Sequence, residues 1–181
     1  MRYHNITKAD MLNGEGLRVV LWVSGCSHHC PGCQNPITWD ANDGLEFDDN
    51  AKKEIFQELE HDWCSGLTLS GGDPLFCSNR KDISKLVLEV KKKYPDKTIW
   101  LYTGYCWNEL LKLSKEDKDI DTILKNIDVL LDGRFVLKLA SEKIHYVGSS
   151  NQRIIDVKES IKKNKEILYI DNDKVLEGVE V

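Results

Sequence analysis

The sequence predicts an α/β protein, because short apolar runs alternate along the chain with longer segments whose apolar residues recur at helical spacing. Most of the short runs end at glycine, serine or aspartate, as buried strands often do. Strands separated by helices are typical of βαβ units. The regular pattern covers roughly 150 residues, whereas a complete eight-unit barrel takes about 250. We therefore expect a partial, incomplete β/α barrel with a mainly parallel, curved sheet.

Length and charge limit the function classes. The chain has 181 residues, the length of about one domain. It carries 25 Lys and Arg against 30 Asp and Glu, a formal charge of −5, which argues against a general nucleic-acid binder. No apolar stretch approaches the roughly 18 residues of a membrane span, and residues 1–10 have no apolar signal-peptide core. We expect a cytoplasmic protein that binds neither membranes nor nucleic acid.

The first half of the chain contains two predicted strands and a helix. The first strand, residues 17–23, is rich in Val and Leu and leads directly into a group of cysteines. Asp48 suits the N-cap of a helix over residues 51–59, which carries apolar side chains four positions apart. The second strand, residues 67–69, ends in the glycine turn 70–74.

The second half repeats this alternation. Apolar residues at i, i+3, i+4 and i+7 predict an amphipathic helix over about 80–94. A strand follows at 98–103, then a helical region over 107–126 with a polar break at 114–119. A fourth strand is predicted at 127–131, before an Asp-Gly pair.

Residues that suit a binding site follow the predicted strands: Cys26, Gly71, Thr103 and Asp132. In parallel α/β proteins, ligand sites lie at the edge formed by the carboxyl ends of the strands. We therefore expect these residues around one site at that edge.

Three cysteines, Cys26, Cys30 and Cys33, form a C-x3-C-x2-C motif. Three thiolates on one tight loop can hold three irons of a cubane cluster and leave the fourth iron open for substrate. Pro31 and Gly32 turn this loop sharply. In a chain without an export signal, the spacing favours metal chemistry over disulfides.

Zinc is the competing metal, with His28 or His29 as a fourth ligand. Structural zinc sites usually pair C-x2-C with a second pair, and Cys64, Cys77 and Cys106 form no such pair. We interpret the two histidines as loop residues near a cluster and these three cysteines as core or strand-end residues.

The cysteine motif after the first strand resembles that of radical S-adenosylmethionine enzymes. Over about residues 1–153, the chain resembles the activating proteins of anaerobic (class III) ribonucleoside-triphosphate reductase. We therefore interpret 1–153 as a radical SAM activating-enzyme domain, and 154–181 as a C-terminal extension that packs on it as an edge strand or helix. Besides the cysteines, the resemblance rests on Asn13-Gly14-Glu15-Gly16, Val23-Ser24-Gly25-Cys26, Cys30-Pro31-Gly32-Cys33, Ser70-Gly71-Gly72-Asp73-Pro74-Leu75, Tyr102-Thr103-Gly104-Tyr105, Asp132-Gly133-Arg134-Phe135 and Gly148-Ser149-Ser150-Asn151-Gln152.

The resemblance implies an oxidoreductase in which Cys26, Cys30 and Cys33 ligate one [4Fe-4S] cluster that binds S-adenosyl-L-methionine. Reductive cleavage of S-adenosyl-L-methionine yields a 5′-deoxyadenosyl radical. This radical generates a glycyl radical on a glycine loop of the reductase large subunit. A reductant such as flavodoxin is implied as a second partner. The implied cofactor-binding residues are Gly32, Cys33, Gln34, Ser70, Gly71, Gly72, Asp73, Thr103 and Asp132.

Some positions depart from the superfamily pattern. Asp73 stands where many members carry Glu, and Gly32 stands where an aromatic residue usually precedes the third cysteine. Tyr102 takes the place of an acidic ligand of related enzymes. Trp39 could supply the apolar cover that the aromatic residue before the third cysteine usually gives, but we favour a core position for it. We interpret Arg153 as a partner for a carboxylate of the cofactor, of the reductase or of the protein surface.

Three other classes of function remain open: another radical SAM reaction, electron transfer and zinc-stabilised binding. The chain could activate another glycyl-radical enzyme or catalyse a small-molecule radical reaction such as deazapurine synthesis, although residues 148–152 and the turn 71–74 favour the reductase. An iron–sulfur electron carrier would hold every iron by protein ligands and so predicts a fourth cysteine ligand. A zinc-stabilised binding module predicts a colourless protein.

Overall fold

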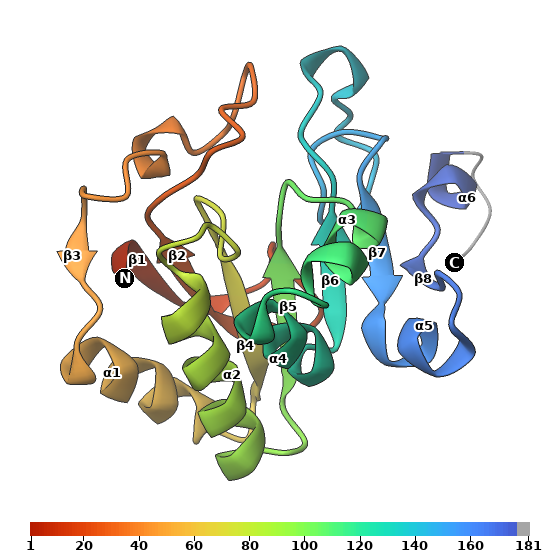
Figure 1. Ribbon diagram of the computed structural model, residues 1–181. Helices are drawn as coiled ribbons and strands as arrows, with labels where there is room; N and C mark the ends of the chain where they lie inside the picture. Colours follow the sequence, from red (N-terminus) through yellow and green to blue (C-terminus); the bar gives the residue numbers. More distant parts are fainter. Residues whose placement is uncertain (177–181) are drawn as a thin grey trace.

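A single open sheet of eight strands organises the computed structural model, which describes residues 1–176 (Figure 1). The strand order is β3-β1-β2-β4-β5-β6-β7-β8. The strands are β1 (Arg2–Asp10), β2 (Leu17–Val23), β3 (Leu45–Glu46), β4 (Cys64–Gly71), β5 (Thr98–Tyr102), β6 (Val129–Asp132), β7 (Arg153–Asp156) and β8 (Leu168–Ile170).

The α/β class is confirmed and the sheet is not closed, but the expectation of a mainly parallel sheet is wrong. Among the described strands, β2–β4, β4–β5 and β5–β6 pair in parallel, whereas the four outer pairings are antiparallel. The outer strands come from segments with little strand pattern. In β1, for example, Ile6 is the one buried residue, so the usual alternation of apolar and polar positions is absent.

Helices cover one face of the sheet, the face turned to the viewer in Figure 1. Their starts follow from capping: the Asp48 carboxylate accepts a hydrogen bond from Ala51 N, and that of Asp117 accepts from Asp119 N and Ile120 N. The helices are α1 (Asp49–Leu59), α2 (Arg80–Lys93), α3 (Trp107–Leu113), α4 (Lys118–Asn126), α5 (Val157–Lys163) and α6 (Asn172–Leu176), with 3-10 turns at Pro36–Thr38 and Leu137–Leu139.

The predicted elements of the middle of the chain are found close to their predicted bounds. The polar break expected in 107–126 separates α3 from α4. The last predicted strand, 127–131, is β6 and begins two residues later, at Val129. Before it, the Asp128 carboxylate accepts a hydrogen bond from Ile99 N, so this residue turns the chain into the sheet. None of the helices in residues 1–176 has the length and apolar composition that crossing a bilayer requires.

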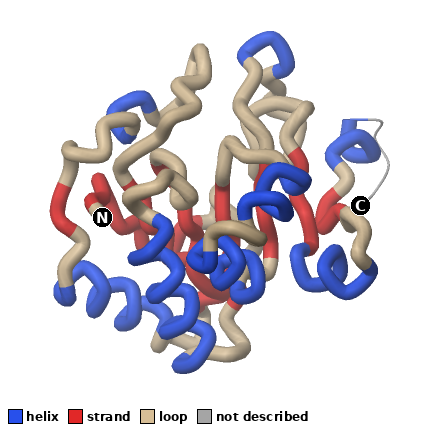
Figure 2. The backbone as a smooth tube through the Cα atoms, viewed as in Figure 1, coloured by secondary structure: helices blue, strands red, loops and turns tan. Residues whose placement is uncertain are grey.

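The two faces of the sheet bury different side chains. Alternate strand residues such as Leu21, Leu69 and Leu101 pack under the helices. The opposite face buries a smaller cluster around Trp100, which is 1% exposed and meets the edge of the Tyr146 ring. The loops at the carboxyl ends of the central strands gather at one edge of the sheet (Figure 2).

Arg18 is buried on the Trp100 face, toward the amino-terminal end of β2. Its guanidinium lies 5.3 Å from the centre of the Trp100 ring and donates to neutral oxygens of Thr68, Thr98, Leu67 and Glu15. Burial lowers the pKa of Arg18 to about 10, so it stays charged at neutral pH. This cation occupies the end of the sheet opposite the loops.

Candidate metal centre

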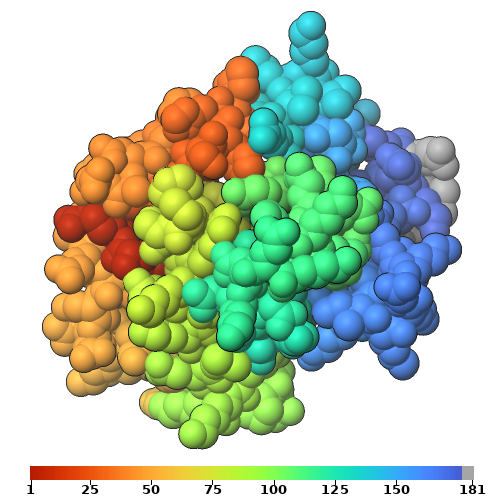
Figure 3. Space-filling model, in the orientation of Figure 1, coloured from red at the N-terminus to blue at the C-terminus, as the bar shows by residue number. Residues whose placement is uncertain are grey.

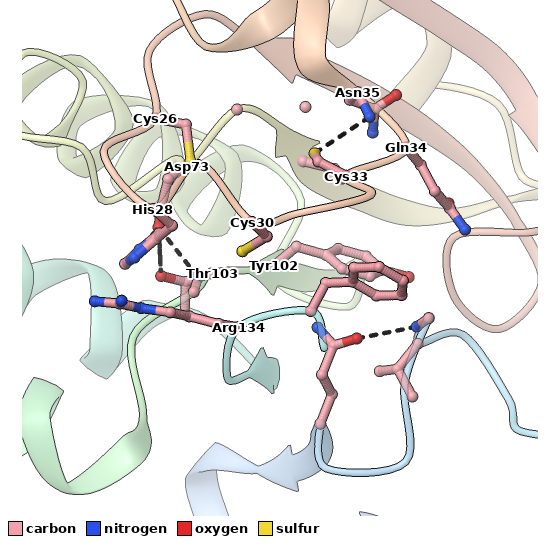
Figure 4. A pocket seen from close by; sticks show the side chains of 18 of the residues that line it. Cys26, His28, Cys30, Cys33, Gln34, Asn35, Asp73, Tyr102, Thr103 and Arg134 are labelled. Carbon is pink, nitrogen blue, oxygen red and sulfur yellow. Dashed lines mark hydrogen bonds and ion pairs between the residues drawn. The ribbon is translucent and has the colours of Figure 1, made fainter. Parts of the chain in front are cut away.

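A cavity of about 580 Å³ lies at the carboxyl ends of β2, β4 and β5 (Figure 4). Of the four residues expected around one site at this edge, Cys26, Gly71 and Thr103 line the cavity and Asp132 does not. The predicted site residues that line it are Cys26, Cys30, Cys33, Gln34, Ser70, Gly71, Gly72, Asp73 and Thr103. Gly32 and Asp132 are not among the residues that line it, although their chain neighbours Cys33 and Gly133 are.

Backbone hydrogen bonds hold both ends of the cysteine loop, residues 26–33. At its start, Gly25 N and Cys26 N donate to the carbonyls of Thr38 and Trp39, at 2.8 and 3.1 Å. At its end, Cys33 N donates to Cys30 O at 3.0 Å, which closes a tight turn. Gly32 lies inside this turn with a φ of +76°, a conformation that a residue with a Cβ rarely adopts.

The three thiols fit an iron–sulfur cluster. Figure 4 shows their sulfur atoms around the same space, and all three residues are half-buried. Burial raises the pKa of the Cys26 thiol, although backbone N–H groups of His28 and His29 hydrogen-bond to it and oppose this rise. Within residues 1–176, no three His, Cys, Asp or Glu side chains gather as ligands of one metal ion do. A [4Fe-4S] cluster instead puts each cysteine on a separate iron.

The glycine turn after β4 packs directly against the start of the cysteine loop. A Cβ on Gly72 would lie 2.5 Å from Gly25 O, and one on Gly71 would lie 2.7 Å from Val23 O. Two hydrogen bonds of 2.8 Å join the same backbones, from Gly72 N to Val23 O and from Asp73 N to Gly25 O. Glycine is therefore required at both positions by the close approach of two chains.

Asp73 is 1% exposed, and its carboxylate accepts hydrogen bonds from four residues. The backbone N–H groups of Leu75 and Gly104 donate at 2.8 and 3.1 Å, and the Thr103 hydroxyl donates at 3.0 Å to one oxygen and 3.1 Å to the other. The fourth donor is His28 Nε2, at 2.7 Å. His28 was interpreted as a loop residue near a cluster, and its contact with Asp73 was not predicted; its side chain is 4% exposed.

Asp132 is fully buried at the end of β6, behind the cavity wall. Its carboxylate accepts from Trp107 N at 2.7 Å and from both Nε and a terminal nitrogen of Arg153. Arg153 also contacts Glu166 at 2.6 Å. Arg153 was expected to pair with a carboxylate of the cofactor, of the reductase or of the protein surface. The structure pairs it with two carboxylates of the protein itself, Asp132 and Glu166.

The Gly148–Gln152 motif builds the wall opposite the cysteines. Gln152 Oε1 accepts from Gly148 N and Ser149 N at 3.0 and 3.1 Å, while its Nε2 donates to Gly133 O at 2.9 Å. Tyr102 closes the same side, because its hydroxyl donates to Tyr146 O at 2.8 Å. Burial raises the pKa of Tyr102, so it is a neutral hydrogen-bond donor here.

Two cavity residues were missed or misassigned by sequence reasoning. Arg134 is exposed and is the single Lys or Arg among the described residues that line the cavity, yet its motif was noted only for the resemblance. Trp39, for which a core position was favoured over apolar cover of the site, lines the cavity and stacks on His29 with 4.8 Å between ring centres. Neither position carries a pattern signal, because loop residues have no periodicity.

Comparisons with known proteins agree with this geometry. Residues 12–155 match the family described as a 4Fe-4S single cluster domain, which supports an iron–sulfur cluster in this chain. The anaerobic ribonucleoside-triphosphate reductase-activating protein of Enterobacteria phage T4 is 44% identical over 154 residues, covering 85% of this chain and 93% of the relative. The proteins of the same name from Haemophilus influenzae and Escherichia coli K12 are 42% and 41% identical, over 85% and 84% of this chain and 97% and 96% of theirs. This chain belongs to the family of anaerobic ribonucleoside-triphosphate reductase-activating proteins.

Proposed function

We propose that this protein activates an anaerobic ribonucleoside-triphosphate reductase, with Cys26, Cys30 and Cys33 holding a [4Fe-4S] cluster. The observation that carries the proposal is the placement of three half-buried thiols from one loop on one cavity. When bound, the cluster and S-adenosyl-L-methionine together supply the 5′-deoxyadenosyl radical that takes a hydrogen from a glycine of the reductase. The fold is then a partial β/α barrel of the radical SAM type, with 1–153 as its domain and 154–181 as an extension on it.

The chain's own part is to bind and orient the cofactor. We place it against the cysteine loop and the turn after β4, because Gly71 and Gly72 line the cavity where these two segments pack together. Around the cofactor we place Gly32, Gln34, Ser70 and Thr103, which lie at or beside the cavity wall. Asp73 and Asp132 position this wall through their hydrogen bonds. Arg134 supplies a cation for a carboxylate of the cofactor.

The reductase would meet the protein at the mouth of the cavity. There the cysteine loop and the 3-10 turn Leu137–Leu139 stand next to each other, the orange and cyan segments at the top of Figure 3. A Cβ on Gly32 would lie 3.0 Å from Leu137 Cδ1. Leu137 and Leu139 of this turn are exposed apolar side chains, as is Ile37 in the 3-10 turn Pro36–Thr38 that follows the cysteine loop. They suit contact with a peptide loop that presents its glycine. The reductase large subunit supplies that loop, a reductant such as flavodoxin supplies the electron, and we place this reaction in the cytoplasm.

Product analysis tests the proposal. The protein is loaded with iron and sulfide under nitrogen, reduced and mixed with S-adenosyl-L-methionine, and 5′-deoxyadenosine is measured by mass spectrometry. We expect product from the wild type and from Cys77→Ala, an exposed cysteine outside the loop, and none from Cys30→Ala. Adding a reductase large subunit should then give a glycyl-radical signal in electron paramagnetic resonance (EPR).

Two results would overturn the proposal. A cluster-loaded protein that forms no 5′-deoxyadenosine with or without the reductase would be an electron carrier. A colourless protein that binds zinc in place of iron would be a binding module.

A further inference from the structure

We propose that His28 and Asp73 form a positioning pair that holds the centre of the cysteine loop, so that Asp73 acts through His28 and not by contact with the cofactor. The inference deepens the proposed function and rests on it for the role of the loop. It concerns side chains that the structure shows in direct contact, with His28 Nε2 2.7 Å from Asp73 Oδ2 (Figure 4).

The hydrogen-bonding capacity of the Asp73 carboxylate is already used within the protein. An ionised carboxylate offers about four acceptor positions. Leu75 N donates to Oδ1, His28 Nε2 and Gly104 N donate to Oδ2, and the Thr103 hydroxyl lies 3.1 Å from Oδ1 and 3.0 Å from Oδ2, so four donors surround the carboxylate. A cofactor ammonium would have to displace one of these donors from a side chain that is 2% exposed.

The His28 ring is enclosed on several sides. A Cβ on Gly104 would lie 2.3 Å from His28 Cδ2, so glycine is what allows the ring to reach Asp73. The ring also meets the Tyr105 ring edge-on, with 4.9 Å between centres. The His28 side chain is therefore enclosed by three residues that follow β4 and β5: Asp73, Gly104 and Tyr105.

The hydrogen bond between His28 and Asp73 fixes the middle of the cysteine loop to the glycine turn after β4. In residues 27–32, His28 is the only side chain that hydrogen-bonds to another part of the described chain. The backbone–backbone hydrogen bonds of the loop are at its two ends, at Gly25 to Cys26 and within Cys30 to Cys33, and, within the described chain, the N–H groups of His28 and His29 bond only to the Cys26 thiol inside the loop. His28 lies between two of the cysteines, so its position sets the distance of Cys26 from Cys30.

The first test uses hydrogen–deuterium exchange on the metal-free protein. In His28→Ala, we expect the amide hydrogens of residues 26–33 to exchange roughly tenfold faster than in the wild type. His28→Gln, whose amide N–H can still reach Asp73, should restore most of the protection. Ser27→Ala is the matched control, because this neighbouring loop residue is exposed and, among the described residues, its side chain makes no hydrogen bond. Unchanged exchange in His28→Ala would overturn the proposal.

The second test separates positioning from cofactor contact on the cluster-loaded protein. We expect Asp73→Asn and His28→Ala to change the EPR spectrum of the reduced cluster before any cofactor is added, and the double variant to resemble either single one. If Asp73→Asn weakens S-adenosyl-L-methionine binding with the spectrum and loop exchange unchanged, Asp73 contacts the cofactor and the proposal is wrong. The exchange test needs no cluster, so a failure of the proposed radical function leaves its outcome readable.

Discussion

Asp73 and Asp132 are two buried aspartates at the same edge of one sheet, and their surroundings differ in kind. Asp73 lines the cavity and gathers neutral donors and one histidine from three loops. Asp132 lies behind the wall, where an arginine and the first N–H of α3 compensate its charge. Burial of a carboxylate after a strand therefore does not identify a ligand-binding group. The hydrogen-bond partners of the carboxylate decide whether it supports the cavity or only stabilises the fold.

The largest effect is expected from removing the cation of the Asp132 pair. Arg153→Met leaves a fully buried carboxylate without its partner, which should lower the free energy of unfolding by about 3 kcal/mol. Adding Asp132→Asn should recover most of this loss, because the unpaired charge disappears. Urea unfolding measures both variants, and a loss below about 1 kcal/mol in Arg153→Met would show that the pair matters little. The cluster spectrum of the folded protein should stay as in the wild type.

A pair of glycine variants sharpens the comparison, since each of the two regions has a glycine after its strand. Gly104→Ala places a Cβ within 2.3 Å of the His28 ring, so the ring must move. We expect about tenfold weaker retention of iron, measured as iron per chain after gel filtration.

Gly133→Ala is the matched change beside Asp132. Its Cβ would meet nothing closer than 3.8 Å, but Gly133 has a φ of +96°. We expect a loss of about 1–2 kcal/mol in unfolding free energy, with iron retention unchanged. Equal iron loss in both glycine variants would mean that the two regions do not differ in the way described.

The smallest effect concerns Asp128, at the opposite end of β6 from Asp132. Burial raises its pKa, but hydrogen bonds from Lys158, Lys91 and Ile99 N outweigh burial and hold the pKa below the ordinary value. A pKa that is lower in the folded state gives stability above the unfolded value of about 3.9, and this stability is lost as pH falls through the folded value. Asp128→Asn should cost about 1 kcal/mol at pH 7.

Comparison with Asp128→Asn also tests how the stability of the wild type falls at low pH. Below about pH 4, the wild type should lose stability toward the level of Asp128→Asn, because its carboxylate becomes protonated. Thermal unfolding between pH 3 and pH 7 measures this difference. A constant gap between the two proteins over that range would contradict the pKa direction given for Asp128.

The sequence predicted the middle of the fold better than its ends. Strand β2, helices α1 and α2 and the break between α3 and α4 follow from apolar periodicity and capping residues, which are local signals. The antiparallel outer strands were not foreseen, because β1 has a single buried residue and β8 is mostly exposed. Their pairing depends on contacts between distant segments.

The candidate site shows the same division. The cysteine spacing and the glycine turn indicated their chemistry, since few residue types can replace them. The contacts of His28 and Arg153 were not readable, because hydrogen bonds between loops depend on how the loops are placed. All nine predictions of cofactor-binding residues stay predictions: Gly32, Cys33, Gln34, Ser70, Gly71, Gly72, Asp73, Thr103 and Asp132.

The strand order has a consequence for synthesis of the chain. From β1 to β8, apart from the short β3, each strand pairs with the one made just before it. The cysteine loop and the glycine turn are thus complete by about residue 75, whereas Gly148–Gln152 are made later. At about 5–20 residues per second, the ribosome needs roughly 4–15 s to add the far wall. During that interval the cavity lacks the part of its lining that Gly148 and Gln152 supply, so a cluster inserted before the chain is released would enter a site that is still open on this side.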